Sequence, residues 1–321
     1  MTTPQELHVV FGAGQVGPPL ARLLAAAGHR VRLVRRSDAP VTLAGVEAVR
    51  ADARDAAAAS EAVRGATAVY HCVNVAYFAA TWQAELPPVL DGLIAAAGRT
   101  GARLVVLDNL YAMGKPGGRK LTEATPFNPC SKKGEIRARL HQQLEAAVKR
   151  GHVRAVTGRA SDFYGPGGVG TLFADRFWPA ALAGKPAAMI VPVETPHTYH
   201  FIPDVAAGLA KLGQDAGAEG TYMLPCHPAE STRALVDHLA AALGQPIATA
   251  RMSPLVVKAL GLFMPIVREL GEMAYQWDEP FEVDDARFRA RYGAIAAPRD
   301  EAARQTVAWG RVTYGGAATR R

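Results

Sequence analysis

The first half of the chain alternates short, β-branched apolar runs with segments whose apolar residues recur at helical spacing. The runs lie at residues 7–11, 30–34, 46–49, 68–73, 103–107 and 153–157, and they predict strands buried on both faces. Between the first two runs, Val16, Leu20 and Leu24 share a helical face, and Gly28 stands where a C-terminal cap belongs. Strand, helix and strand in alternation predict right-handed crossovers and a doubly wound parallel α/β sheet.

This regular alternation ends near Tyr164. The run Gly165-Pro-Gly-Gly168 interrupts it, and the following stretch mixes proline-rich turns with short helices. We therefore expect a first domain over residues 1–165 and a smaller C-terminal substrate lobe over residues 166–321. Residues near 198–215 are expected to return and pack on the first domain.

Composition narrows the class of protein. The 321 residues are 49% hydrophobic and 20% charged, which is typical of a soluble globular enzyme. The net charge of +7 is spread along the chain, which favours small anionic ligands and argues against nucleic acid as a partner. The three cysteines, Cys72, Cys130 and Cys226, fit neither a disulfide framework nor a zinc ribbon. With no signal peptide and no membrane-length apolar segment, a cytoplasmic location and no membrane partner are expected.

A glycine-rich turn directly follows the first predicted strand and opens the first predicted helix. It reads Gly12-Ala-Gly14-Gln15-Val16-Gly17. In this context Gly12 permits a tight turn, Gly14 lets a pyrophosphate approach the main chain, and Gly17 lets the helix lie close to the sheet. The free N–H groups at the helix start attract the same anion. The segment predicts dinucleotide binding on a Rossmann sheet.

The end of the second strand indicates which dinucleotide binds. A site for NAD would place a carboxylate there, on the ribose 2′-hydroxyl. The chain instead has Arg35, Arg36 and Ser37, which can bind a 2′-phosphate through charge-assisted hydrogen bonds. The sequence therefore predicts NADP(H) as the cofactor. The alternative is a pair of solvated arginines at a strand end.

Four further segments give the chain a resemblance to the extended short-chain dehydrogenase/reductases, the NAD(P)-dependent epimerase/dehydratase-like group. They lie at residues 51–53, 69–74, 159–166 and 199–205. The resemblance implies that Asp52 and Ala53 contact the adenine and that Val73 and Asn74 flank the cofactor. It spans nearly the whole chain, and it leaves the substrate open because one fold hosts many reactions.

The catalytic signature of that family is not preserved. The family uses a Ser or Thr after the fifth strand and a later Tyr-x-x-x-Lys, in which the lysine lowers the pKa of the tyrosine so that it can exchange a proton. Asn109 stands where the hydroxyl residue would align, and the segment expected to hold the Tyr-x-x-x-Lys contains Lys132 and Lys133 without a tyrosine. Tyr111 is the only tyrosine between residues 108 and 163.

Three explanations remain open for this loss. Tyr111 takes the role of the missing tyrosine, with Asn109 orienting the substrate carbonyl and Lys132 or Lys133 beside the cofactor ribose. Alternatively, no protein acid is needed, because hydride addition to a conjugated alkene gives an enolate that Asn109 or Tyr111 could stabilise. In the third explanation catalysis is lost and the fold only senses NADP(H).

The remaining candidate residues concern the substrate and metals. Asp162 stands where nucleotide-sugar relatives usually have a substrate-contacting Asn, and a carboxylate there would repel a diphosphate. Apolar residues of the second half suit an apolar ligand, although most are expected in the lobe's own core. The spacing of the histidines and Cys226 indicates no metal site. The apolar residues are Phe173, Phe177, Trp178, Phe263, Met264, Met273 and Trp277, and the histidines are His197, His200 and His227.

We expect an NADP(H)-dependent oxidoreductase that transfers hydride to or from a small carbonyl or enone compound. One alternative is an epimerase or dehydratase that keeps its cofactor and returns the hydride, and another is a non-catalytic NADP(H)-binding protein. A homodimer is also expected, because helices near residues 85–97 and 135–149 lie where relatives often pair and have alanine-rich faces.

Overall fold

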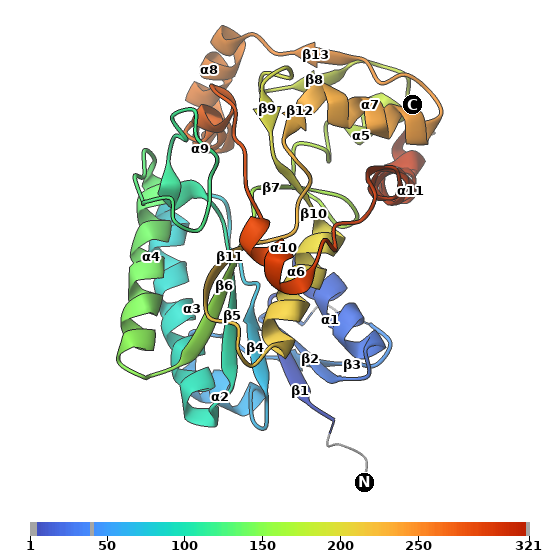
Figure 1. Cartoon of the computed structure of the whole chain (residues 1–321). Coiled ribbons are helices and arrows are strands. Elements are labelled where there is room, and N and C mark those ends of the chain that lie inside the picture. The colour runs from blue at the N-terminus through green and yellow to red at the C-terminus, as the bar shows by residue number, and fades with distance from the viewer. Residues whose placement is uncertain (1–4, 39–41, 319–321) are drawn as a thin grey trace.

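A seven-stranded parallel sheet forms the centre of the computed structural model, which describes residues 5–38 and 42–318. The strand order is β11-β6-β5-β4-β1-β2-β3 (Figure 1). Six of these strands coincide with the predicted runs, so the doubly wound α/β fold is confirmed. The strands are β1 (Leu7–Phe11), β2 (Arg30–Arg35), β3 (Val46–Arg50), β4 (Ala68–His71), β5 (Arg103–Asp108), β6 (Arg154–Arg159) and β11 (Gly220–Met223).

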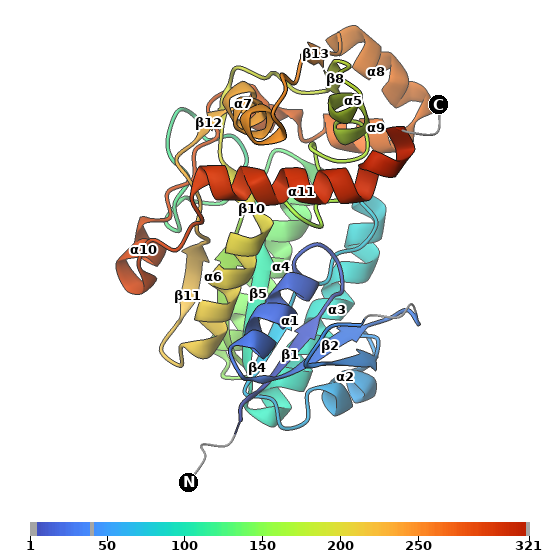
Figure 2. The ribbon, with the colours of Figure 1, turned by 90° about the vertical axis from the view of Figure 1, so that its right-hand side faces the viewer.

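Helices cover both faces of this sheet. Along β1, Val9 and Phe11 point into one core while Val10 points into the other, as the two-residue period of a strand requires. Both faces are apolar, so each needs its own helical layer. One layer is formed by α1 (Gly17–Ala26) and α6 (Ile202–Gln214), and the other by α2 (Ala56–Ala62), α3 (Ala79–Thr100) and α4 (Lys132–Lys149) (Figure 2).

Local capping fixes where the helices on the second face begin and end. The Asp55 carboxylate accepts hydrogen bonds from the first turn of α2, and the Ser131 hydroxyl accepts one from the Gly134 N–H at the start of α4. Gly101 ends α3 with a left-handed φ of 68°. These signals are local in sequence, which explains why the first half of the chain was predictable.

The C-terminal lobe is built from short elements around an aromatic core. Phe173, Phe177 and Trp178 are fully buried there, so these three pack inside the lobe and do not line a cleft. Helix α11 (Arg299–Ala318) runs along the lobe on the side of the sheet domain (Figure 2). The other elements are β7 (Asp162–Tyr164), α5 (Trp178–Leu182), β8 (Ala187–Met189), β9 (Pro196–His197), β10 (Tyr199–Phe201), β12 (Glu230–Ser231), α7 (Thr232–Leu243), β13 (Thr249–Arg251), α8 (Pro254–Phe263), α9 (Pro265–Gly271) and a 3₁₀ turn η2 (Ala274–Trp277).

The chain returns from the lobe to the sheet domain. Helix α6 packs on the sheet, and β11 then pairs with β6 as an edge strand. A second return brings Phe288 of α10 (Ala286–Tyr292) into the same core. The sequence did not predict strand β11, because its residues Gly-Thr-Tyr-Met do not form a β-branched apolar run.

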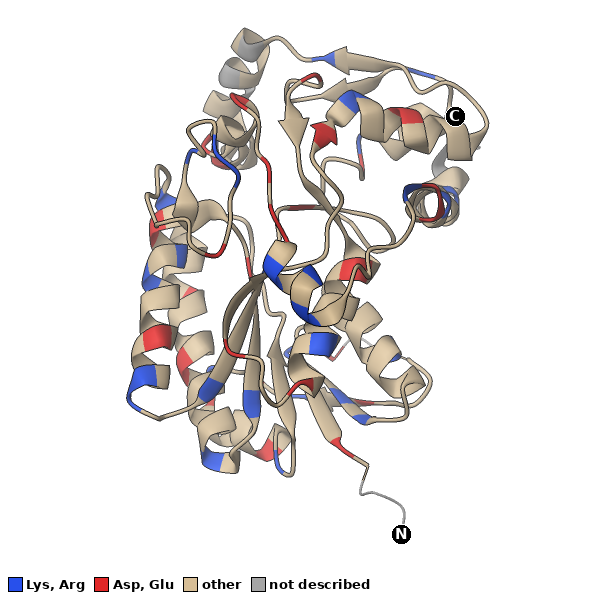
Figure 3. Cartoon of the chain, viewed as in Figure 1, with Lys and Arg blue, Asp and Glu red and all other residues tan. Residues whose placement is uncertain are grey.

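Charged residues of both signs are interspersed over the two parts of the molecule in the view of Figure 3. None of the helices in the described ranges has the length and apolar character that spanning a bilayer requires.

Candidate active site

The carboxyl ends of the parallel strands meet at the edge of the sheet that faces the lobe (Figure 1). Strand β1 pairs with β2 on one side and with β4 on the other, so the order of connections reverses between β1 and β4. A crevice opens at such a switch point, and ligands of doubly wound folds bind there.

The glycine turn lies at this switch point, and its three glycines have different surroundings. A Cβ on Gly12 would stand 2.4 Å from the Cys72 carbonyl oxygen, and one on Gly17 would stand 1.8 Å from the Gly12 carbonyl oxygen. A Cβ on Gly14 would meet nothing within 4 Å, and Gly14 is exposed. The structure therefore matches the roles expected for a pyrophosphate-binding turn, in which the second glycine leaves space for the ligand.

The lobe contacts this turn directly. The side-chain amide of Gln15 donates to the Val169 carbonyl, and Gly167 also lies against the Gln15 main chain. Val16 is buried at the N-cap of α1. Across the crevice, Val73 is half-buried and Asn74 is exposed in the loop after β4. A dinucleotide would thus be held between the turn, this loop and the lobe segment 165–170.

Arginine and carboxylate side chains form ion pairs near the ends of β2 and β3. Arg36 forms an ion pair with Glu85 of α3 at 3.0 Å, and Arg54 reaches the same carboxylate at 3.5 Å. Arg54 also donates to Asp52 and lowers the pKa of that carboxyl. Arg35 donates to the Ser37 hydroxyl. Asp52 therefore already has a cationic partner at the position expected to contact adenine, while Ala53 is buried beneath it.

Two tyrosine hydroxyls meet above the end of β5. Tyr111 begins the 3₁₀ turn η1 (Tyr111–Met113), and its hydroxyl lies 3.0 Å from that of Tyr77 in the loop after β4. The Tyr111 ring is parallel to that of Trp82, with centroids 6.1 Å apart. Burial raises the pKa of both Tyr77 and Tyr111 above the usual range. The pair therefore stays protonated at neutral pH.

Lys133 is fully buried, and its ammonium is neutralised by the lobe. It forms ion pairs with Glu269 of α9 and, at 3.0 Å, with Glu272 just after α9. The same two carboxylates accept main-chain N–H groups at the starts of α3 and α4, from Ala79 and Lys132 respectively. The sequence placed Lys132 or Lys133 beside the cofactor ribose, whereas the Lys133 ammonium lies between two carboxylates of the lobe. The Lys132 side chain is exposed at the first turn of α4.

Arg137 is the cation that acts on Tyr111. It lies one helical turn after Lys133, its guanidinium is 4.6 Å from the centre of the Trp82 ring, and it partly offsets the raised pKa of Tyr111. Asp108 at the end of β5 holds this guanidinium at 3.5 Å and that of Arg159 at 3.3 Å. Sequence analysis missed Arg137. Its spacing of four from Lys133 was the available signal.

Asn109 positions the tyrosine loop. Its side-chain oxygen accepts the Tyr111 main-chain N–H at 3.1 Å. The oxygen is therefore used inside the protein, and the amide NH₂ is the part that can donate to a ligand.

Asp162 and His197 form a second polar pair on the lobe side. Their side chains approach to 2.9 Å between Oδ2 and Nε2, and the other ring nitrogen lies 3.3 Å from the Gln276 carbonyl. The imidazole therefore bridges the Asp162 carboxylate and the Gln276 carbonyl, and its Nε2 also lies 3.3 Å from the Ser161 hydroxyl. Because the Asp162 carboxylate already has this hydrogen-bond partner, the argument that it would repel a diphosphate is weaker. Trp277 stacks on His197 at 4.6 Å.

The Asp162 carboxylate acts electrostatically on tyrosines of both the sheet domain and the lobe. Its charge contributes to the raised pKa of Tyr77, Tyr111 and Tyr275, although burial is the larger cause for each. Tyr275 and Met273 share an apolar cluster with residues of the tyrosine loop. Met273 and Trp277 are buried at 2% and 8% exposure, whereas Phe263 is 84% exposed and Met264 37% exposed.

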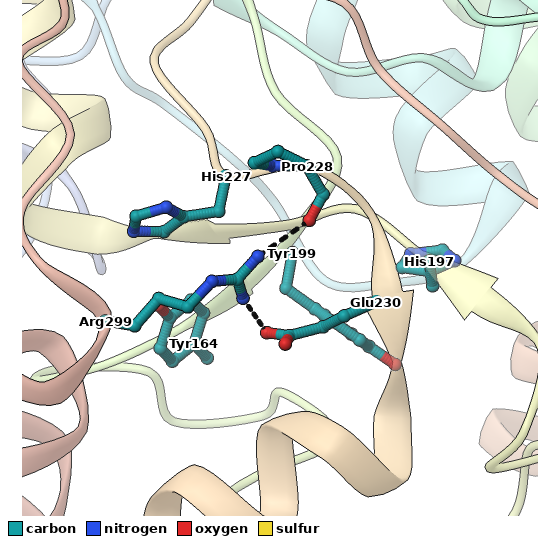
Figure 4. Close-up of a pocket in the computed structure, with 7 residues that line it drawn as sticks. All are labelled: Tyr164, His197, Tyr199, His227, Pro228, Glu230 and Arg299. Atoms are coloured by element: carbon teal, nitrogen blue, oxygen red, sulfur yellow. Dashed lines mark hydrogen bonds and ion pairs between the residues drawn. The ribbon is translucent and has the colours of Figure 1, made fainter.

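A small pocket of about 10 Å³ lies deeper in the lobe, with room for about one water molecule (Figure 4). Arg299 points into it and donates to the Glu230 carboxylate and, at 3.0 Å, to the Pro228 carbonyl. Tyr164 and His197 also line it. The positive charge of Arg299 is therefore balanced within the protein.

Residues 8–223 match the model of the NAD dependent epimerase/dehydratase family. The chain belongs to this family. No curated protein matches it in sequence. The resemblance drawn from the sequence is confirmed, and a nicotinamide cofactor is the family's defining ligand.

Solved structures share the fold over almost the whole chain. The Bordetella bronchiseptica enzyme WbmH in complex with NAD⁺ is 18% identical with a TM-score of 0.75, covering 96% of this chain and 99% of that chain. The Thermus thermophilus UDP-glucose 4-epimerase complex with NAD is 20% identical with a TM-score of 0.74, covering 96% and 99%. A UDP-N-acetylglucosamine 4-epimerase from Methanobrevibacter ruminantium in complex with UDP-N-acetylmuramic acid is 15% identical with a TM-score of 0.76, covering 96% and 98%. At these identities the likeness shows the fold.

Proposed function

We propose that this family member is an NADP(H)-dependent oxidoreductase that reduces a small carbonyl or enone compound. The observation that carries the proposal is the half-buried Tyr77–Tyr111 hydroxyl pair, next to a lysine whose charge is balanced by two carboxylates. Such a pair can give a proton, and although Arg137 partly offsets the effect of burial, the pKa of Tyr111 stays raised.

The side chains available to donate or accept a proton favour reduction over epimerisation. An epimerase that retains its cofactor must first remove a proton from a substrate alcohol and later return it. The family's lysine makes that possible by lowering the pKa of the tyrosine. Here burial raises the pKa of Tyr111, and Glu269 and Glu272 hold Lys133. A tyrosine that stays protonated suits one direction, the donation of a proton as hydride arrives.

The cofactor would supply the hydride, and the chain supplies orientation and the proton. The turn from Gly12 to Gly17 would hold the pyrophosphate, and Val73 and Asn74 would lie beside the cofactor. The Asn109 amide NH₂ would donate to the substrate oxygen and Tyr111 would protonate the product.

The preference for NADP(H) rests on the cationic end of β2. Arg35, Arg36 and Ser37 provide two guanidiniums and a hydroxyl for a 2′-phosphate. Arg36 must then share its charge between the phosphate and Glu85, which it contacts at 3.0 Å.

The substrate class follows from charge and lining. Binding a sugar-nucleotide diphosphate requires uncompensated positive charge, whereas Arg299 in the lobe pocket is paired with Glu230. The surroundings of the Tyr111 loop are apolar and aromatic, since Met273 and Tyr275 share a cluster with it. These features favour a small, uncharged carbonyl or enone compound.

The direct test is net oxidation of NADPH by the purified protein across a panel of aldehydes, ketones and conjugated enones. Sustained oxidation with stoichiometric product, faster with NADPH than with NADH, is expected. Interconversion of a substrate without net NADPH loss would favour an epimerase. Tight NADPH binding without any turnover would favour the sensing role.

A further inference from the structure

A cluster of possible metal ligands lies at the opposite end of the sheet from the active site. It consists of Glu6 just before β1, His8 within β1, and His29 in the turn before β2. One ligand atom from each side chain lies within 4.8 Å of the other two. His8 Nε2 is 3.5 Å from a Glu6 carboxylate oxygen, and His29 Nδ1 is 3.8 Å from the same oxygen.

The His8 ring nitrogen is the second observation that points to a ligand. His8 is 0% exposed, yet its Nε2 has no hydrogen-bond partner among the described residues. A buried polar atom without a partner is costly. Because this nitrogen faces Glu6 and the His29 ring, whose centroid is 4.3 Å from that of His8, a cation between the three side chains would give it a partner.

Both imidazoles also have outer partners that fix their orientation. The His8 Nδ1 lies 2.8 Å from the Tyr70 hydroxyl, and the His29 Nε2 lies 2.9 Å from the Gln214 side-chain amide. Gly213 makes room for that hydroxyl, since a Cβ there would stand 2.0 Å from it. The Gln214 Nε2 faces the His29 Nε2 as placed, and exchanging the oxygen and nitrogen of that amide would let the His29 Nε2–H donate to it. With that exchange, and with His8 Nδ1–H donating to Tyr70, Nε2 of His8 and Nδ1 of His29 carry the lone pairs that face Glu6. Metal-bound histidines usually have such partners.

We propose that Glu6, His8 and His29 bind a divalent transition-metal ion of the zinc class. Two imidazoles and one carboxylate suit Zn²⁺, with Co²⁺ as a spectroscopic substitute, and three protein ligands leave one position for water. Tetrahedral zinc needs ligand atoms about 3.3 Å apart. The separations of 3.5 and 3.8 Å from Glu6, and the one of up to 4.8 Å between the two imidazoles, must therefore contract on binding. The ion would join the start of β1, the turn before β2 and the end of α6.

The test uses full-length protein without a histidine tag, first treated with a chelator and then titrated with Co²⁺ and Zn²⁺. We expect one equivalent of Co²⁺ to give visible d–d absorption that Zn²⁺ abolishes, and bound Zn²⁺ to raise the melting temperature. His29→Gln and Glu6→Gln change side chains at the protein surface and should each weaken Zn²⁺ binding 10-fold or more. Tyr70→Phe, which removes an outer partner, should weaken it about 10-fold.

His238→Gln is the matched control, because His238 also faces a glutamate, Glu230, at 3.3 Å, but lies in the lobe. This variant should bind Zn²⁺ as the unmodified protein does. The proposal is overturned if the unmodified protein gives no Co²⁺ spectrum. It is equally overturned if His29→Gln and Glu6→Gln bind as tightly as the control, because the metal would then lie elsewhere.

Discussion

At the cofactor end of the cleft, the main chain of one short segment shapes the site, whereas at the catalytic end side chains meet from segments far apart in the sequence. The turn from Gly12 to Gly17 depends on three glycines whose roles follow from backbone sterics. Tyr111 is hydrogen-bonded to Tyr77, and Arg137 acts on its pKa. Helix α9 is part of the same region because its Glu269 forms an ion pair with Lys133. The first kind of site follows the family pattern closely, while the second has been rebuilt around a missing Tyr-x-x-x-Lys.

The largest expected effect concerns the contact between the sheet domain and the C-terminal lobe. Lys133→Met would leave Glu269 and Glu272 without their buried cationic partner, so the free energy of unfolding should fall by about 3–5 kcal/mol. Urea denaturation measures this directly. Lys132→Met is the control, because that exposed side chain should change stability by less than about 0.5 kcal/mol. Equal stability of the two variants would mean that Lys133 does not hold the lobe and that its charge is available to the cofactor.

The glycine turn gives the next effect, and two neighbouring glycines should respond differently. Gly14→Ala adds a methyl group that meets no protein atom, so the fold should keep its stability while NADPH affinity falls at least 10-fold. Gly17→Ala brings a methyl group against the Gly12 carbonyl oxygen and should destabilise the protein by about 1–3 kcal/mol. Calorimetric titration with thermal melts separates the two. Unchanged NADPH affinity in Gly14→Ala would place the pyrophosphate elsewhere.

These two sets of residues also show how much of the fold and of the site could be predicted from the sequence alone. Strand runs, caps and the glycine turn are encoded within about ten residues, so the sheet and the cofactor end were predictable. Lys133 and Glu269 are more than a hundred positions apart, and no local pattern connects them. The same holds for Asp162 and His197, whose pairing depends on how β7 and β9 lie in the lobe.

Acid should destabilise the fold through buried neutral histidines. Burial lowers the pKa of His200 and that of His71 to about 4, from about 6.5 in the unfolded chain. Between these values the unfolded chain binds more protons, so the stability present above pH 6.5 is lost as the pH falls towards 4. The loss per histidine should reach about 2 kcal/mol at pH 5.

Denaturation at pH 7.5, 6 and 5 measures this dependence. His200 Nδ1 accepts the Ser161 N–H at 3.0 Å and Nε2 donates to the Leu224 carbonyl at 3.2 Å, so the neutral ring is fully used. His200→Gln should therefore reduce the pH dependence, while the exposed His152→Gln should not. If both variants keep the dependence of the unmodified protein, His200 does not carry it.

Cofactor selectivity is expected to show the smallest effects. Arg35→Asp should weaken NADPH binding about 10-fold relative to NADH, because it places a carboxylate beside the 2′-phosphate. Glu85→Gln should strengthen NADPH binding a few-fold, because it frees Arg36 from its ion pair. Fluorescence titration with NADPH and with NADH measures both affinities for each variant. Weaker NADH binding in Glu85→Gln, with no gain for NADPH, would assign Glu85 to the ribose hydroxyls of NAD.

The central claim is that Tyr111, kept protonated, donates the proton as NADPH delivers hydride. The most direct measurement is the rate of NADPH oxidation in a single turnover by Tyr111→Phe, with NADPH affinity measured in parallel and Tyr314→Phe, a tyrosine of α11, as the control. A rate at least about 10²-fold lower is expected for Tyr111→Phe, with NADPH affinity within about two-fold and the control unchanged. An unchanged rate in Tyr111→Phe would show that Tyr111 is not the proton donor.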